Sequence, residues 1–236
     1  MRKTALTLFT AAALILACGC TKPDEPDNGG GNNDPVTNYG YVDLGLPSGT
    51  LWATHNIGAD NPEDFGSYFA WGETLPKDKY SWNTYLYCNG DYYTLTKYCD
   101  NPNYGNNGFT DTLTTLLPED DAATANWGED WRMPTISEWV ELYENTNQTW
   151  TTENTVYGRK FTATNGNSLF LPAAGYRNGS GLYGTVSDGY YWSSTFCTDS
   201  PYNAWYIYFL SDEYGTYNLG RYRGRSVRPV RSAPQD

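Results

Sequence analysis

The chain has 236 residues, a formal net charge of −12 and a mean hydropathy of −0.64. This length holds one domain of ordinary size and an appendage, and the acidic charge argues against nucleic acid or an anionic membrane surface as a partner. With 17% aromatic residues and 24 glycines, the composition predicts a loop-rich domain that contains β-strands and has a core of Trp and Tyr.

The N-terminal stretch, residues 1–20, reads MRKTALTLFTAAALILACGC. Its basic start and its apolar run, too short to span a bilayer, predict a secretory signal peptide. The end resembles the lipobox of bacterial lipoproteins, which implies that Cys18 is lipidated, with Cys20 as the alternative. A plain signal peptide that releases a soluble domain is the other alternative.

Residues 21–38 contain Pro, Gly, Asn and acidic residues without an aromatic, and this composition predicts a flexible tether. The acidic cluster of Asp24, Glu25 and Asp27 resembles the export signal of Bacteroidota surface lipoproteins. This implies an outer-membrane lipoprotein displayed at the cell surface, which contacts the membrane through its lipid anchor only. Residues 39–236 are predicted to form a single domain.

The domain begins with short strand signals. Residues 41–59 predict two short strands around a turn at 47–49, and residues 65–73 predict a third strand. Residues 80–112 are rich in Tyr and Asn and predict a long surface loop region. Within that region an exported protein would permit a local disulfide, predicted between Cys88 and Cys99, and Cys197 would then stay unpaired as a small buried or semi-exposed residue.

Two helices are predicted in the middle of the chain. Pro118, with acidic residues behind it, and Gly128 mark the ends of a short helix within residues 116–128. Thr135 and Glu138 form a T-x-x-E capping box that begins a helix at residues 136–145. The apolar face of this second helix consists of Trp139, Leu142 and Tyr143.

The pattern then returns to a period of two. Residues 158–175 predict a hairpin that turns at Asn165 and the glycine after it. Residues 188–195 predict a short strand, and residues 225–230 predict a closing strand that Pro229 limits to an edge or an end.

Between these strands lies the stretch AWYIYFL. Alternation places Trp205, Ile207 and Phe209 on one face, predicted to be buried, and Tyr206 and Tyr208 on the other, predicted to be presented to a ligand. Strands, then helices, then strands predict an α+β fold.

Several segments carry a family resemblance. WRMPTISEWVEL is similar to the R-L-P-T-x-x-E-W stretch of the formylglycine-generating-enzyme-like superfamily. Together with VDLGLPSGTLWATHNIGA, YFAWGET, LPAAGYR, YYWSST and SVRPVR, it makes residues 41–231 resemble the Fibrobacter succinogenes major paralogous domain. The resemblance implies a C-type-lectin-like fold with two helices, twisted antiparallel sheets whose N- and C-terminal strands lie close, and long loops of variable function.

The recurring residues of these segments have a structural interpretation. Trp131 and Trp139 are expected in the core. Arg132 and Arg228 are expected to bond buried carbonyls or the acidic turn that contains Asp120, because a guanidinium presents five donors.

The residues do not favour an enzyme. Enzymes of the superfamily need paired reactive cysteines with a metal, or a set of iron-binding histidines, and His55 is the sole histidine. The sugar-binding signatures of calcium-dependent lectins are absent, and no cofactor is expected. A structural calcium at Asp120 and Asp121, or at Asp212 and Glu213, is the alternative to solvated acidic turns.

Ten of the 22 tyrosines lie between residues 176 and 225, among Gly and Ser. This composition is typical of antibody paratopes. We therefore predict that loops around 178–190, 197–203 and 211–224 bind an extracellular glycan or protein; a structural subunit of a fimbria or surface layer is the alternative. The predicted ligand-binding residues are Tyr183, Tyr190, Tyr202, Tyr206, Tyr208, Tyr214, Tyr217, Tyr222 and Arg223.

Residues 176–231 contain no Lys, Gln or Met, and Glu213 is their single Glu. These residue types, with Trp, are the ones that codons ending in a pyrimidine cannot encode. Retroelement-diversified proteins carry such codons near the end of a C-type-lectin-like domain, so we hypothesise diversification of this segment. The candidate positions are Tyr206, Tyr208, Ser211, Tyr214, Tyr217, Tyr222 and Arg223.

Overall fold

The structure is a computed structural model that describes residues 39–233. They belong to a compact unit that spans Thr37–Asp236. The predicted signal peptide, the tether and the lipidation at Cys18 or Cys20 lie outside the described residues. Within the described range, no helix combines the length and the apolar character that a membrane crossing requires.

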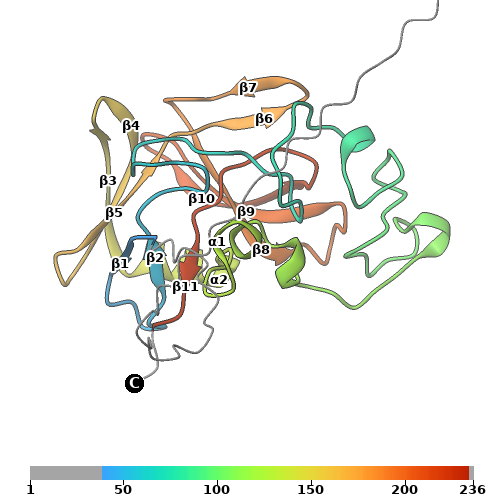
Figure 1. Cartoon of the computed structure of the whole chain (residues 1–236), viewed down its shortest axis with the longest axis horizontal. Helices are drawn as coiled ribbons and strands as arrows, with labels where there is room; N and C mark the ends of the chain where they lie inside the picture. Colours follow the sequence, from blue (N-terminus) through green and yellow to red (C-terminus); the bar gives the residue numbers. More distant parts are fainter. Residues whose placement is uncertain (1–38, 234–236) are drawn as a thin grey trace, which may run out of the picture. The chain divides into compact units, whose positions relative to one another are not determined.

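The two ends of the domain meet in one antiparallel sheet of strand order β1-β2-β11 (Figure 1). Strand β1 spans Tyr41–Asp43, β2 spans Leu51–Ala53 and β11 spans Val230–Arg231. Val42 and Val230 both pair with Trp52 of the central strand, which is fully buried. The predicted strand pair and closing strand are confirmed, as is the implied closeness of the terminal strands.

Both predicted helices are confirmed, but the first begins later than its predicted signal, because Pro118 starts a short 3₁₀ turn at Pro118–Asp120 and not the α-helix. Helix α1 spans Ala122–Trp127; Asp121 accepts hydrogen bonds from the N–H groups of its first turn, and Gly128, at a φ of 93°, ends it. Helix α2 spans Ile136–Glu144 and begins with the capping box of Thr135 and Glu138. Its buried residues are Trp139, Leu142 and Tyr143.

A second antiparallel sheet has the strand order β3-β4-β5. Strand β3 spans Thr146–Glu153, β4 spans Val156–Ala163 and β5 spans Ser168–Pro172. The hairpin at Asn165 and Gly166 is confirmed by the β4–β5 pairing. Strand β3 is not anticipated by the sequence, because Asn154 and Thr155 form its turn at positive φ without a glycine.

The third sheet has the strand order β10-β9-β8 and is central to the candidate site. Strand β8 spans Gly189–Phe196, β9 spans Asn203–Phe209 and β10 spans Tyr214–Gly220. A small hairpin of β6 (Tyr176–Asn178) and β7 (Gly181–Tyr183) precedes it in the chain. Much of the predicted 211–224 loop is therefore a strand. The prediction failed because the Tyr, Gly and Asn content of this segment is typical of a loop.

The core lies between these sheets and the helices. Ile207 and Phe209 of β9 are buried in the same apolar cluster as Trp139 and Leu142 of α2. The predicted strand within residues 65–73 is wrong: this segment forms only a single bridge, between Phe69 and Arg225.

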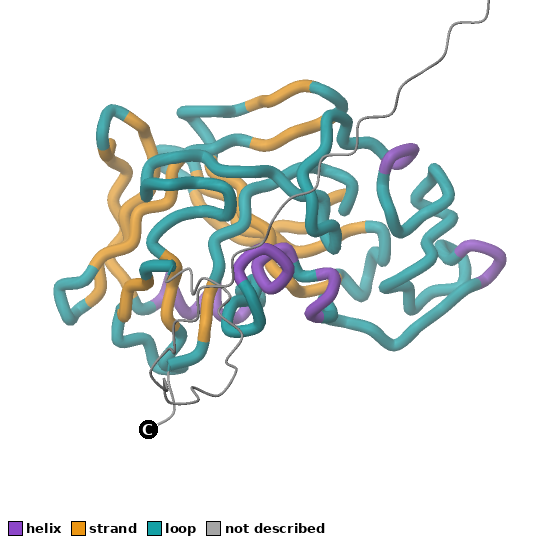
Figure 2. Tube along the Cα trace, viewed as in Figure 1, coloured by secondary structure: helices purple, strands orange, loops and turns teal. Residues whose placement is uncertain are grey.

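Residues 80–112 contain no strand and only short 3₁₀ turns, so this region is drawn almost entirely as loop in Figure 2. It is nonetheless packed: Tyr80, Tyr85 and Leu95 are buried in an apolar cluster with Cys88 and Cys99. The prediction of a surface loop is therefore correct for the irregular backbone and for most residues of the region, and wrong for the few side chains that form this cluster.

The predicted disulfide between Cys88 and Cys99 is not formed, since both are free, buried thiols. Cys88 Sγ donates to the carbonyl oxygen of Trp82 at 3.2 Å, and Cys99 Sγ donates to that of Asn101 at 3.2 Å. Cys197 is also free and buried, as expected. The described domain consists mostly of small antiparallel sheets with two helices, an arrangement consistent with the predicted α+β class and also with a mainly-β fold.

Candidate ligand-binding site

One face of the β8–β9–β10 sheet collects tyrosines. Tyr190 lies opposite Tyr208, and Tyr217 lies opposite Tyr206, in the antiparallel registers of the sheet. Residues directly opposite one another on neighbouring strands share a face. We call this surface, defined by Tyr190, Tyr206, Tyr208 and Tyr217, the tyrosine face.

A buried arginine lies against the tyrosine face. Arg225 Cζ is 3.7 Å from the ring centroid of Tyr206, 4.5 Å from that of Trp192 and 5.3 Å from that of Tyr190. Only 1% of Arg225 is exposed, and burial lowers the pKa of its guanidinium to about 10. The aromatic rings supply cation–π stabilisation in place of an acidic partner.

Tyr206 corrects the sequence prediction. Its ring stays on the predicted face, but only 5% of the residue is exposed, because Arg225 and Trp192 pack against it. Tyr206 is therefore covered within the tyrosine face and is not free to contact a ligand. Tyr217 beside it is 57% exposed, and Tyr208 is half-buried with its hydroxyl donating to Glu213.

Two further predicted residues lie apart from these rings. Tyr214 has the opposite parity to Tyr217 on β10, so it points to the other face of the sheet and stacks on Tyr143 with 4.6 Å between ring centroids. Tyr183 is 50% exposed on β7 and stacks on Tyr176, whose ring in turn contacts Tyr190. Tyr214 is thus separate from the site, whereas Tyr183 extends the aromatic surface.

The remaining three predicted residues meet in a pocket of about 310 Å³. Tyr202 comes from the turn before β9, whereas Tyr222 and Arg223 come from the turn after β10. We call it the aromatic pocket; its walls are formed by Trp82, Tyr92, Tyr202, Asn203, Leu219, Gly220, Tyr222 and Arg223.

The rings of the aromatic pocket contact one another. Trp82 lies 4.9 Å from Tyr222, and Tyr92 lies 5.2 Å from Tyr202, measured between ring centroids. A Cβ atom at Gly220 would come within 2.8 Å of the Tyr222 ring and 3.5 Å of Trp82, so the absence of a side chain at this position lets the two rings approach.

Two polar side chains complete the aromatic pocket. Arg223 Cζ lies over the ring of Tyr222 at 5.6 Å and over that of Tyr176 at 5.4 Å. Arg223 therefore links the pocket to the tyrosine face through Tyr176. Asn203 donates from Nδ2 to Asn218 Oδ1 at 3.0 Å, which leaves its own Oδ1 as an acceptor.

Sequence reasoning missed Trp82 and Tyr92. Both lie in the long loop region, and they meet Tyr202 and Tyr222 although more than 100 residues separate the two segments. The one local signal was the density of Tyr and Trp in WNTYLYCNGDYY, which exceeds what a solvated loop needs.

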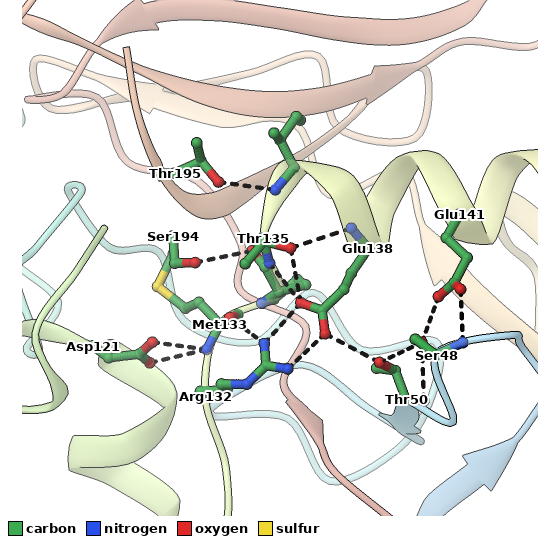
Figure 3. Close-up of polar contacts among 12 residues, drawn as sticks. Ser48, Thr50, Asp121, Arg132, Met133, Thr135, Glu138, Glu141, Ser194 and Thr195 are labelled. Atoms are coloured by element: carbon green, nitrogen blue, oxygen red, sulfur yellow. Dashed lines mark hydrogen bonds and ion pairs between the residues drawn. The ribbon is translucent and has the colours of Figure 1, made fainter. Parts of the chain in front are cut away.

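The WRMPTISEW motif has a structural role, which Figure 3 shows. Arg132 donates to both carboxylate oxygens of Glu138, which also accepts from the N–H of Thr135 and from Thr50 Oγ1. Asp121 accepts from the N–H of Met133 through both oxygens. Because these groups satisfy one another, the motif joins α1 and α2 to the residue that precedes β2.

Arg132 and Arg228, the two arginines expected to have a structural role, have different kinds of partner. Arg132 pairs with Glu138 rather than with the acidic turn at Asp120. Arg228 bonds buried carbonyls, as expected: Nη1 donates to the oxygens of Ala53 and Thr54, and Nε donates to Asn56 Oδ1. Trp131 and Trp139 are both buried, which confirms their assignment to the core.

The acidic turn is also filled by protein donors. Tyr87 and Tyr98 donate their hydroxyls to the two oxygens of Asp120, and Lys97 Nζ lies 2.5 Å from Oδ2. Burial, followed by the hydrogen bond to Asp120, raises the pKa of both tyrosines. No group of three or more His, Cys, Asp or Glu that could hold a metal occurs among residues 39–233, so the calcium alternative stays a hypothesis.

The groups considered for catalysis are engaged in packing. His55 Nδ1 lies 3.2 Å from the carbonyl oxygen of Asn56, and its ring contacts Trp127. Burial raises the pKa of the thiols of Cys88, Cys99 and Cys197, which disfavours the thiolate that a nucleophile requires.

Fold and site define a domain of small antiparallel sheets and two helices with a pocket built from aromatic rings. The family model described as the Lcl C-terminal domain matches residues 48–231. The chain therefore belongs to this family, the Fibrobacter major paralogous domain family that its motifs indicated. No curated protein and no solved structure matches the chain.

Proposed function

We propose that this domain is the recognition part of a surface-exposed bacterial lipoprotein, and that it binds an extracellular glycan in the aromatic pocket. The observation that carries the proposal is the meeting of four aromatic rings, Trp82, Tyr92, Tyr202 and Tyr222, around an open volume of about 310 Å³. These rings come from two distant segments and face one shared space.

The chemistry of the aromatic pocket favours a sugar. The apolar face of a pyranose ring packs on an aromatic ring, while its hydroxyls need donors and acceptors at the edge. Asn203 and Arg223 provide an acceptor and donors of this kind. The volume lies at the small end of the range for ligand pockets, roughly 300 to 1,000 Å³, so it suits a terminal sugar or a short glycan.

The proposed location rests on the sequence of the N-terminus. Lipidation at Cys18, or at Cys20, would anchor the protein in the outer membrane, and the tether of residues 21–38 would hold the domain at the cell surface. We further propose that the fold is C-type-lectin-like. The two helices, and the sheet that contains both terminal strands, support that assignment.

A glycan array with the full chain in mild detergent tests the proposal. We expect binding to a limited set of glycans, weakened about tenfold or more by Trp82→Ala and by Tyr222→Ala, since each change removes one stacking surface. Tyr157→Ala is the matched control, because this tyrosine is 47% exposed on β4, outside the pocket.

Two results would contradict the proposal. One is array binding that neither pocket variant changes. The other is stable co-purification with one protein, without glycan binding, which would favour the structural or fimbria-associated alternative. Adhesion of cells that display the protein should follow the same order of variants as the array.

Diversification of the C-terminal segment is a separate proposal. Of its candidate positions, Tyr214 and Tyr217 are at least half exposed, and Tyr206 is buried. The DNA around the gene tests it: a template repeat and a neighbouring reverse transcriptase gene are expected, and the absence of both would end the idea.

A further inference from the structure

Two arginines at the aromatic surface donate no side-chain hydrogen bond to any residue that the structure describes. The Nε atoms of Arg223 and Arg225 are buried without a partner, and neither residue forms an ion pair within the described range. By contrast, Arg159, Arg221 and Arg228 also lack an ion pair, but each donates to a backbone carbonyl oxygen. Buried charges are normally paired, because desolvation is costly without compensation.

The missing partner is notable in so acidic a protein. The chain carries 27 acidic against 15 basic residues. Even so, the eight residues that form the walls of the aromatic pocket include one cation, Arg223, and no carboxylate. The local charge of the pocket is therefore opposite to the charge of the whole chain.

Arg223 also acts on Arg225. Burial lowers the pKa of Arg225, and the nearby charge of Arg223 lowers it further. Two cations that repel each other at a partly desolvated surface become more stable when an anion binds between or beside them.

We infer that the glycan bound in the aromatic pocket carries a carboxylate, and that Arg223 binds this group. The inference rests on the proposed function and specifies its ligand as an acidic sugar, such as a uronic or a sialic acid. A guanidinium offers parallel N–H donors that match the two oxygens of a carboxylate.

The geometry assigns a place to each part of such a sugar. Tyr176 and Tyr222 hold the guanidinium of Arg223 through their ring faces, so contacts to the rings fix the group while its outer N–H donors remain for the ligand. The sugar ring then packs on Trp82 and Tyr222, and the free Oδ1 of Asn203 accepts from a hydroxyl.

Titration calorimetry on the full chain in mild detergent tests the inference. The probes are oligosaccharides that end in glucuronic acid or in N-acetylneuraminic acid, each compared with the same molecule after reduction of its carboxyl group to the alcohol. We expect the reduced form of the preferred sugar to bind about 10- to 100-fold more weakly, the usual effect of losing a charge-assisted hydrogen-bonded pair.

Arg223→Gln should abolish the difference between the acidic and reduced sugars while the reduced sugar still binds, and Arg223→Lys should restore part of it. Arg177→Gln is the matched control: Arg177 is also half-buried over a tyrosine, Tyr68, but lies in the wall of another pocket. This control should keep the full preference for the acid.

The outcomes separate the inference from the proposed function. Equal binding of acidic and reduced sugars, or a preference for a sulfated neutral sugar, would contradict the inference that the glycan carries a carboxylate. The proposal that the domain binds a glycan would still stand. A preference for the acid that persists in Arg223→Gln overturns the role of Arg223. Failure of every glycan to bind, in a folded protein, overturns both.

Discussion

Arg228 and Arg225 lie three residues apart, and the two regions they occupy differ in how a buried charge is compensated. Both residues are almost completely buried, and burial lowers the pKa of each to about 10. Arg228 donates to Asn56 Oδ1 at 2.9 Å and to the carbonyl oxygens of Ala53 and Thr54 at 3.1 and 2.7 Å. Arg225 has aromatic rings around it and no acidic partner among the described residues.

This difference distinguishes a region with a structural role, around Arg228, from the region near Arg225 that we propose for ligand recognition. Around Arg228, strand β2 and the chain that follows it supply the acceptors, so the charge ties the terminal sheet together. Around Arg225 the rings of the tyrosine face stabilise a cation but accept no strong hydrogen bond. Arg223, which lies beside Arg225, forms part of the wall of the aromatic pocket and donates to no described residue, so a second molecule can add stability there. This is why we place the ligand in the aromatic pocket.

The largest expected effect is at Arg228, which donates three hydrogen bonds from Nε and Nη1, although its Nη2 has no partner. Arg228→Met would leave three buried acceptors without a donor, and we expect a loss of about 3–5 kcal/mol in the free energy of unfolding, measured by urea denaturation. Arg231→Met is the control, because its partner Asp130 is largely exposed and such pairs contribute less than about 1 kcal/mol. Similar losses in both variants would break the comparison.

A second test uses pH at the ion pair of Arg132 and Glu138, where protein groups also compensate a charge. Burial raises the pKa of Glu138, but hydrogen bonds from Arg132 and Thr135 outweigh it, so the folded pKa is below the ordinary value. The stability this carboxylate adds is complete above its unfolded pKa of about 4.3 and is lost as the pH falls through the lower folded pKa.

We therefore expect Glu138→Gln to cost about 1–3 kcal/mol at pH 7 and to flatten the decline of stability below about pH 4. Urea denaturation at a series of pH values measures both effects. A variant whose stability falls with acid as steeply as that of the natural protein would show that Glu138 is not the responsible group.

The smallest expected effect is at Arg225. Arg225→Met leaves no acceptor unsatisfied and removes a desolvated charge, while it also removes the cation–π contacts. We expect the free energy of unfolding to change by less than about 2 kcal/mol, clearly less than for Arg228→Met under the same conditions. A loss as large as that of Arg228→Met would mean that the rings compensate Arg225 fully, and the contrast would disappear.

The parts of the fold that were predictable have local signals. The capping box fixes the start of α2, and Asn165 with Gly166 fixes the β4–β5 turn, because each depends on residues a few positions apart. The sequence did not predict strand β10, because what makes this segment a strand is its pairing with β9 and not a regular pattern of its own residues. Pairing partners far along the chain leave little trace in local composition.

The candidate site shows the same limit. Alternation assigned Tyr206 and Tyr208 to the correct face, but it could not reveal that Arg225 and Trp192 cover Tyr206. Period and parity give the side of a sheet to which a residue points and say nothing of what packs there. The contact between Trp82 and Tyr222 depends on the path of an irregular loop, which sequence periodicity cannot predict.

A single substitution at Gly220 would change the shape of the aromatic pocket. Since a methyl group there would come within 2.8 Å of the Tyr222 ring, a substitution by alanine or serine would displace this ring from its contact with Trp82. One codon could thus change the shape of the aromatic wall on which we place the sugar ring. Paralogues that share this scaffold could diverge in the size of the ligand they accept while the core, the helices and the terminal sheet stay unchanged.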